Sequence, residues 1–296
     1  MKILITGAGG FVGSHLLAKA ALIFGSENVV ALTSKEIPGY KCIISEQQNL
    51  TALNNQVFSD IEVLIHAGAF TPKNAQQANC VDSCNQNITY TAQLLGFSFD
   101  SLKKVLYTST LDVYGESNCI SESTETKPST LYGASKLYCE HMIRAFGVNR
   151  GISTQVLRLG HIYGPGEEKY QKMLPLTIKN VLLDNLVEIW GDGTELRSFI
   201  YIDDVISSII NAIEFNEEVG VINVVGGISQ SIRELVERII ALSGKSIEIS
   251  FRETASRGKD FVFDNRLLKR TLLEKETDFE SGLEIEYRYM KSKLDV

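Results

Sequence analysis

The segment that most restricts the fold of this chain is a glycine-rich loop near its start. An apolar run at 2–6 leads into Gly7, Gly10 and Gly13, spaced G-x-x-G-x-x-G, and residues 12–24 then carry apolar side chains at helical spacing. Glycines suit a buried strand that turns sharply into a closely packed helix, and the backbone N–H groups at the helix start bind phosphate. The loop predicts a nicotinamide dinucleotide site. The residues expected to contact that cofactor are Gly7, Gly10, Phe11, Val12 and Gly13.

The first half of the chain alternates between short apolar runs and segments of helical periodicity. Strands are expected at 2–6, 28–33, 61–67, 104–109 and 154–159, and helices at 12–24, 75–95 and 131–146. This alternation predicts an α/β fold in which a parallel sheet is covered on both faces, and right-handed crossovers make it doubly wound, as in a Rossmann domain.

After the Gly-Pro-Gly sequence at 164–166 the pattern is more mixed. Helices are expected at 174–185 and 231–243, a strand at 246–251, and two strands at 199–201 and 221–225 that rejoin the sheet. We therefore expect a dinucleotide-binding domain at 1–165, rejoined by 198–225. A smaller, interleaved substrate-binding lobe is expected at 166–197 and 226–296.

Composition argues against several function classes. The net charge is −7 and no cluster of Lys and Arg stands out, so no nucleic-acid partner is expected. No apolar run reaches the ~18 residues of a membrane span, and the N-terminal apolar run is too short for a signal peptide. The five cysteines form no C-x-x-C pair and the four histidines are scattered, so we expect reduced thiols, a cytoplasmic protein and no metal site.

The end of the second expected strand bears on the choice of dinucleotide. An acidic residue at this place takes the ribose hydroxyls of NAD, whereas here Thr33, Ser34 and Lys35 follow the apolar run and the first acid is Glu36. Hydroxyls and a cation suit a 2′-phosphate. The sequence therefore favours NADP(H), with NAD as the alternative if Lys35 is only a solvated loop residue.

A Y-x-x-x-K pattern on the expected helix at 131–146 supplies a proton-transfer pair. Tyr132 and Lys136 lie four residues apart and so share a helix face. A nearby ammonium, with a positive nicotinamide ring, favours the phenolate and lowers the phenol pKa from ~10. Tyr132 can then exchange a proton with a substrate oxygen while hydride is exchanged at its carbon. Hydroxyl residues at 108–110 end the preceding strand, where they face the ligand crevice.

Together these segments resemble the extended short-chain dehydrogenase/reductases of the NAD-dependent epimerase/dehydratase family. The matching segments, in order, are TGAGGFVG (6–13), HAGA (66–69), NITYT (87–91), STLDVYG (109–115), YGASK (132–136), LRLGHIYGP (157–165) and RSFIYIDD (197–204). The resemblance implies that Thr110, Tyr132 and Lys136 form the catalytic triad. It also implies cofactor contacts from Ala67, Gly68, Ala69, Asn87 and Thr108, and a homodimer formed through the helices at 75–95 and 131–146.

The resemblance further implies a nucleoside-diphosphate sugar as substrate. Arginine's planar fork suits a diphosphate, and the match assigns to substrate binding Asp112, Lys172, Met173, Arg197, Arg257 and Asp260. His161 stands where the family usually has asparagine, either as a buried structural histidine or as a donor to substrate. Trp190 is either near the nucleotide base or a core aromatic of the lobe.

The reaction is narrowed by one departure from the family. Dehydratases carry an Asp-Glu pair after the triad hydroxyl, whereas this chain has Leu111 and Asp112, so 4,6-dehydration is not expected. The 33–35 corner favours reduction of a 4-keto sugar by NADPH, as in deoxysugar synthesis for surface polysaccharides. The alternative is a 4-epimerase with tightly bound NAD. A reductase of a small non-nucleotide ketone and a non-catalytic dinucleotide sensor are the remaining hypotheses.

Overall fold

A parallel sheet organises the N-terminal part of the chain. The computed structural model describes residues 1–46, 49–170, 172–217, 219–254 and 258–295. The strands of the sheet are β1 (Ile3–Thr6), β2 (Val29–Thr33), β3 (Lys41–Ile44), β4 (Val63–His66), β5 (Lys104–Thr110), β6 (Ser153–Leu159) and β10 (Val221–Val224). Their order is β10-β6-β5-β4-β1-β2-β3, and every adjacent pair is parallel. Strands β1, β2 and β4 are buried throughout, as expected of strands covered on both faces.

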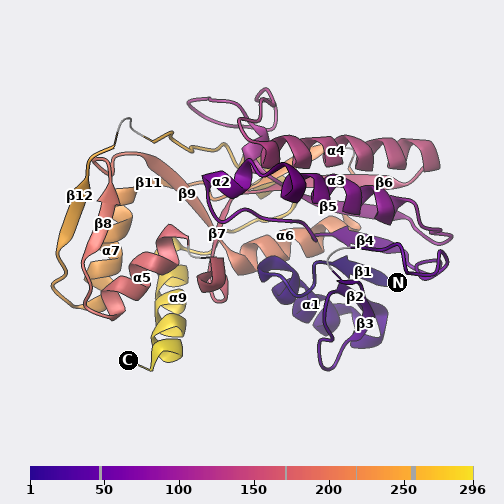
Figure 1. The fold of residues 1–296 in the computed structure, drawn as a ribbon, viewed down its shortest axis with the longest axis horizontal. Coiled ribbons are helices and arrows are strands. Elements are labelled where there is room, and N and C mark those ends of the chain that lie inside the picture. Colours follow the sequence, from indigo (N-terminus) through magenta and orange to yellow (C-terminus); the bar gives the residue numbers. More distant parts are fainter. Residues whose placement is uncertain (47–48, 171, 218, 255–257, 296) are drawn as a thin grey trace.

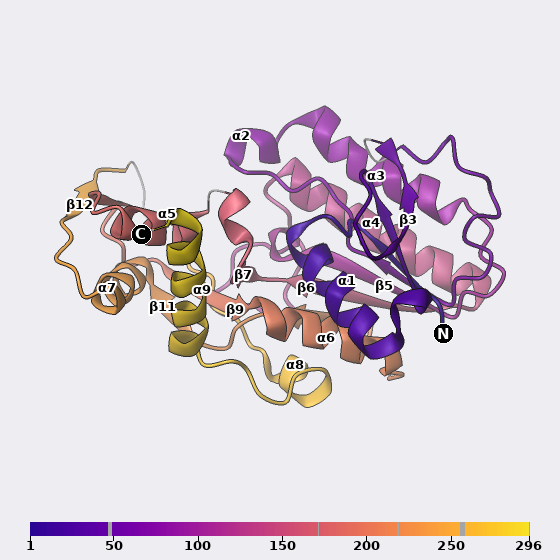
Figure 2. The ribbon, with the colours of Figure 1, turned by 90° about the horizontal axis from the view of Figure 1, so that it is seen from below.

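Helices cover both faces of this sheet, which confirms the doubly wound α/β prediction (Figures 1 and 2). On one face α1 (Phe11–Phe24) packs against α6 (Ile202–Glu214). On the other, α3 (Val81–Leu95) packs against α4 (Leu131–Arg150), and the short α2 (Ala75–Ala78) precedes α3. The single helix expected at 75–95 is thus interrupted at Asn79 and Cys80.

The C-terminal lobe carries two small sheets. One has the order β11-β9-β7, formed by β7 (His161–Tyr163), β9 (Leu196–Tyr201) and β11 (Ser229–Ser231); the other pairs β8 (Val187–Trp190) with β12 (Ile249–Arg252). The helices of this half are α5 (Met173–Leu182), α7 (Ile232–Ser243), α8 (Arg266–Thr271) and α9 (Phe279–Leu294). In Figure 1, α5, α7 and α9 lie with β8 and β12 at the end away from the N-terminus.

The expectation that both 199–201 and 221–225 rejoin the main sheet was half right. β10 does pair with β6, but 199–201 belongs to β9, which pairs with β7 and β11. The reason is that β10 already occupies the edge beside β6. β6 ends before Gly160, whose N–H donates to the Val224 carbonyl at 3.0 Å. The chain then forms β7, and β9 pairs with β7. The chain returns to the main sheet through α6 instead.

The lobe adjoins the carboxyl ends of the central strands, where ligands bind in open parallel sheets. The N-terminus of α1 is tied to the first turn of the lobe, because His15 Nε2 lies 2.9 Å from the Pro165 carbonyl oxygen. Within the described ranges, no helix combines the length and apolar character needed to cross a membrane.

Candidate active site

The glycine loop is fixed by close contacts that exclude side chains. Gly7 adopts φ +68°, and a Cβ on it would lie 2.5 Å from Gly68 Cα. A Cβ on Gly13 would lie 2.0 Å from the Gly7 carbonyl oxygen. The loop therefore holds α1 tightly against β1 and against the segment after β4, as the sequence pattern predicted.

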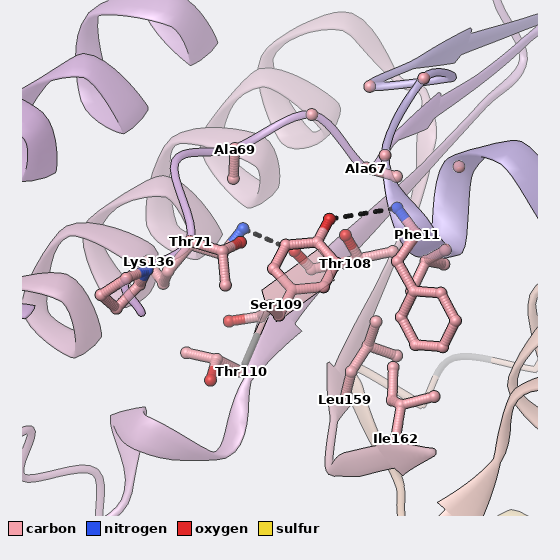
Figure 3. A pocket seen from close by; sticks show the side chains of 18 of the residues that line it. Phe11, Ala67, Ala69, Thr71, Thr108, Ser109, Thr110, Lys136, Leu159 and Ile162 are labelled. Atoms are coloured by element: carbon pink, nitrogen blue, oxygen red, sulfur yellow. Dashed lines mark hydrogen bonds between the residues drawn. The ribbon is translucent and has the colours of Figure 1, made fainter. Parts of the chain in front are cut away.

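The start of α1 fits an anionic group. Its N-cap, Gly10, offers no capping side chain, and its first turn contains no acidic residue, so the helix dipole and the backbone N–H donors of the first turn have no local side-chain partner. One of these donors is engaged, because Phe11 N–H donates to the Tyr170 hydroxyl at 3.2 Å (Figure 3). A pyrophosphate fits this donor set, so the residues present suit a dinucleotide.

One cavity of about 590 Å³ connects the glycine loop with the ends of β2, β4, β5 and β6. Figure 3 shows Thr108, Thr110 and Lys136 on one side of it, with Phe11, Leu159 and Ile162 on another. The structure brings most of the sequence-predicted residues to its lining, namely Gly7, Gly10, Phe11, Val12, Gly13, Thr33, Ser34, Lys35, Ala67, Gly68, Ala69, Thr108, Thr110, Asp112, Tyr132, Lys136, His161 and Lys172. Sequence reasoning missed other lining residues, notably Thr71, Ser45 and Tyr170.

The Tyr–Lys pair lies on the buried face of α4, which begins at the Thr130 cap. Lys136 is 2% exposed, and its Nζ donates to the Thr108 carbonyl at 2.7 Å. Burial lowers the pKa of Lys136 to about 8. Burial acts in the opposite direction on Tyr132, raising the pKa of its phenol well above the ordinary value, and Asp112 raises it further, whereas the hydroxyls of Thr71 and Thr110 lower it.

The expectation of a lowered pKa for Tyr132 included a positive nicotinamide ring, which the protein alone does not contain. In the protein alone, burial outweighs any help from the lysine, so the phenol is protonated at neutral pH. A protonated phenol next to the Thr110 hydroxyl can donate to a substrate oxygen. Accepting a proton requires a further positive charge in the cavity, and an oxidised nicotinamide ring would supply one when bound.

Asn87 lies behind the cavity wall rather than in it. Its side chain accepts from Phe70 N–H at 2.7 Å and donates to Ser135 Oγ at 3.2 Å, and it is 2% exposed. These bonds tie the segment after β4 to α4, which explains its place in the motif without direct contact to a ligand in the cavity.

Glu140 is a buried carboxylate that sequence reasoning missed. It is fully buried; its Oε1 accepts from Ser109 Oγ at 2.6 Å and Arg158 Nε at 2.9 Å, and its Oε2 accepts from Arg158 Nη2 at 2.7 Å. It thus joins α4, β5 and β6 beneath the triad residues. Its place on the Lys136 face of α4 follows from the four-residue spacing, but that spacing gives no sign of its partner Arg158 on β6.

The far end of the cavity carries His161, Asp112 and Lys172. His161 packs on the rings of Phe199 and Phe261, and its buried Nδ1 has no hydrogen-bond partner in the described part of the chain. Burial, followed by the charges of Arg197 and Lys172, lowers the pKa of His161 to about 4, so the ring is neutral. Lys172 Nζ lies 3.2 Å from Glu167 Oε1.

Other residues assigned to substrate lie outside this cavity. The Arg197 guanidinium stacks over the Phe261 ring, 5.1 Å from its centroid, and Asp260 Oδ1 accepts from Leu196 N–H at 2.8 Å, so both join β9 to the segment that follows β12. Met173 begins α5, where its sulfur accepts from the Thr177 hydroxyl. Arg257 lies outside the described residues.

Trp190 is 67% exposed, which excludes the lobe-core interpretation. It ends β8, whose residues alternate between buried and exposed, and falls on the exposed side. Next to it in the chain, a second cavity of about 600 Å³ is lined by Gly191, Asp192, Arg233, Phe251, Arg252, Glu253 and Thr254.

Comparison with known proteins gives one consistent result. Residues 3–226 match the model of the NAD dependent epimerase/dehydratase family. A solved UDP-glucuronic acid 4-epimerase from Bacillus cereus, in complex with NAD and a UDP-sugar analogue, is 30% identical over 99% of this chain and 100% of its own, with a TM-score of 0.86. A UDP-glucose 4-epimerase from Thermotoga maritima, 23% identical, shares the fold with a TM-score of 0.88 over 99% of this chain and 100% of its own.

Two curated relatives extend this result. An uncharacterised UDP-glucose epimerase from Bacillus subtilis is 27% identical over 99% of this chain and 98% of its own length. A dTDP-D-glucose 4,6-dehydratase from Dictyostelium discoideum is 28% identical over 82% of this chain, and this chain spans only 62% of that relative.

Proposed function

The chain belongs to the NAD-dependent epimerase/dehydratase family, and on that premise we propose that it is a nucleotide-sugar 4-epimerase. The observation that carries this proposal is a single cavity that runs from the glycine loop past Tyr132 to the Asp112 end. A cofactor and a sugar ring can meet there at one proton-transfer group. A nicotinamide dinucleotide held at the glycine loop would supply the hydride acceptor and donor for the sugar C4.

In this proposal Tyr132 moves the proton that accompanies each hydride transfer. Its phenol oxygen takes the proton of the sugar O4 on oxidation and gives it back on reduction, so the C4–H and O4–H bonds broken in the first step are both re-formed. The Thr110 hydroxyl would hydrogen-bond the sugar O4, and the Lys136 ammonium would place a positive charge beside Tyr132. This is general acid–base catalysis by a positioned side chain.

Two observations favour an epimerase over the 4-ketoreductase that the sequence favoured. The NAD-containing relative of 30% identity is a 4-epimerase. At residues 33–36 the cavity is lined by the carboxylate of Glu36 as well as by Lys35, so the charges there do not favour a 2′-phosphate over a free ribose hydroxyl. An NADP(H) preference therefore has no support from the relatives, and we propose NAD as the resident cofactor.

Dehydration remains disfavoured for the reason given by the sequence. Of the described residues that line the cavity, only Glu36 and Asp112 carry a carboxylate, and Glu36 is at the cofactor corner. Elimination of water across two carbons needs an acid and a base besides Tyr132. A single nearby carboxylate does not supply both.

For the substrate we propose a nucleoside-diphosphate sugar that spans both halves of the molecule. The sugar ring would lie against Tyr132 and Thr110, and the diphosphate would run toward Lys172 and Arg197. The exposed Trp190 and the cavity beside it then offer a stacking surface for the base. We also propose a homodimer through α3 and α4, which expose Val81, Leu131 and Tyr138.

The experiment starts from the purified protein without added cofactor. Its bound dinucleotide is released by denaturation and identified, and the folded protein is incubated with UDP-glucose, UDP-glucuronic acid or UDP-N-acetylglucosamine while proton NMR follows the C4 epimer. An epimerase retains NAD, forms the epimer unaided and keeps deuterium placed at C4. The matched control is Tyr132→Phe, which should retain the cofactor but form no epimer.

A contrary result is equally specific. Stoichiometric oxidation of NADPH with a 4-keto nucleotide sugar, and no epimer from any of the three substrates, would replace this proposal with the reductase.

A further inference from the structure

Lys136 is an ammonium group removed from water with few partners. Its side chain is 2% exposed, and the Thr108 carbonyl accepts its hydrogen bond at 2.7 Å. Across the part of the chain that the structure describes, Lys136 forms no ion pair. The nearest carboxylate on its own helix, Glu140, is already bound by Arg158 and Ser109. A buried charge with so few partners needs another source of stabilisation.

The aromatic ring of Tyr107 supplies it. Tyr107 is on β5, is 1% exposed, and presents its ring to Lys136 with Nζ 4.3 Å from the ring centroid. That distance is within the ~6 Å at which the electron-rich face of an aromatic ring attracts a cation, and the attraction is stronger when water is excluded. The next residue of the same strand provides the Thr108 carbonyl, so β5 contributes both contacts.

We propose that Tyr107 is a positioning residue for Lys136, whose ring keeps the ammonium charged and directed at the cavity beside Tyr132. The ring acts through Lys136 and does not itself line the cavity. Lys136 and Thr108 both line that cavity.

Other groups around Lys136 cannot replace the ring. From β4, His66 is neutral, because burial lowers its pKa to about 3, and its two nitrogens contact the hydroxyls of Thr6 at 2.8 Å and Thr91 at 3.0 Å. From α4, Cys139 and Glu140 raise the pKa of Lys136, but burial outweighs them and brings it down to about 8. Tyr132 faces the same space as a neutral phenol. With a pKa of about 8, Lys136 is mostly charged at neutral pH, and losing one stabilising contact would bring its titration midpoint close to neutrality.

The Tyr107 hydroxyl offers a way to separate the ring from the rest of the side chain. It is buried and has no hydrogen-bond partner in the described part of the chain. Tyr107→Phe removes this hydroxyl and keeps the ring, so it is a matched control. Tyr107→Leu keeps apolar bulk and removes the aromatic face.

The primary measurement is the titration of Lys136 in the protein alone. Lysine labelled with ¹³C at Cε is followed by NMR against pH, and the Lys136 signal is assigned by its absence in Lys136→Met. We expect Tyr107→Leu to lower the midpoint by about one pH unit, as loss of a desolvated cation–π contact implies. Tyr107→Phe should match the parent. Equal midpoints for Leu and the parent would overturn the proposal.

A second series covers the case in which Tyr107→Leu does not fold. Phenylalanines carrying one, three and five fluorines at position 107 keep the ring shape while weakening its negative face. Midpoints that fall stepwise along the series support the proposal, and a flat series refutes it.

The consequence for turnover rests on the proposed function. The basic limb of kcat/KM for epimerisation should move to lower pH in step with the Lys136 midpoint. If the midpoint moves and no epimerisation occurs in any variant or in the parent, the proposed function fails while the role of Tyr107 stands.

Discussion

A buried carboxyl on α9 makes the stability of this protein depend on pH in an unusual direction. Glu286 is 1% exposed, and its Oε2 is buried without a hydrogen-bond partner among the described residues. It lies near Glu167, which is also buried with an unpartnered Oε2. Burial, followed by the charges of Glu167 and Glu168, raises the pKa of Glu286 to about 9. Burial raises the pKa of Glu167 to about 7.

The sign follows from proton binding. Between about pH 4.5 and 9 the folded protein holds a proton on Glu286 that the unfolded chain releases, so the stability contribution present at low pH is lost as the pH rises. Each pH unit in this window lowers the free energy of unfolding by about 1.4 kcal/mol for one such group, which amounts to about 3 kcal/mol between pH 5 and 7.5.

The perturbation that isolates this effect is Glu286→Gln, which keeps the shape and removes the ionisation. We expect a variant similar to the parent at pH 5 but more stable by about 2–3 kcal/mol at pH 7.5. Urea denaturation at pH 5, 6, 7 and 8 gives the slopes directly. The control is Glu284→Gln on the same helix, which removes an exposed pair with Arg288 worth about 0.3–0.5 kcal/mol and should leave the pH slope unchanged. If Glu286→Gln keeps the parent's slope, Glu286 is ionised in the folded protein and the reasoning is wrong.

Three further predictions concern the site. Tyr132→Phe should lower turnover at least ~100-fold with the fold intact by circular dichroism, and near-normal turnover would refute its role. Glu140→Gln leaves the buried Arg158 guanidinium without its carboxylate and should lower the free energy of unfolding, measured by thermal denaturation, by about 3–5 kcal/mol. Glu237→Gln, which breaks an exposed pair, should lower it by under about 0.5 kcal/mol. Lys35→Glu should weaken NADPH binding relative to NADH by about tenfold or more in fluorescence titrations, since it places a second carboxylate at the cofactor corner; an unchanged ratio would mean that the corner takes no part in selectivity.

The predictable part of the fold is the part specified locally. Strands β1, β2 and β4 are short runs in which every residue is buried, so the sequence shows them directly, and the glycine loop marks the turn after β1. β3 was missed because it is a short edge strand that begins with a lysine, so its apolar run is only three residues long, at 42–44. The misplacement of 199–201 has a different origin. An apolar run predicts a strand but not the strand it pairs with. In the main sheet the position beside β6 is occupied by β10.

The site shows the same division. Tyr132 and Lys136 share a face because helix geometry requires it, and the loop at 7–13 leads directly into α1 as its glycine spacing predicts. The Glu140–Arg158 pair spans a helix and a strand that meet only through the pairing of β5 with β6, so spacing alone could not find it. For Asn87 the sequence motif was recognised but the position was not: its hydrogen bonds to Phe70 and Ser135 place it behind the cavity lining.

Burial also changes what the Tyr–Lys pair can do. It favours the neutral form of both groups, so it raises the pKa of Tyr132 and lowers that of Lys136. In the protein alone the phenol keeps its proton, which suits the half-reaction in which Tyr132 donates to a keto oxygen. The opposite half-reaction needs the phenolate, which the positive charge of an oxidised nicotinamide would favour once that cofactor is bound. In the proposed epimerase, Tyr132 would accept a proton while that charge is present and donate one after the charge is lost, so one residue would serve both half-reactions of a turnover.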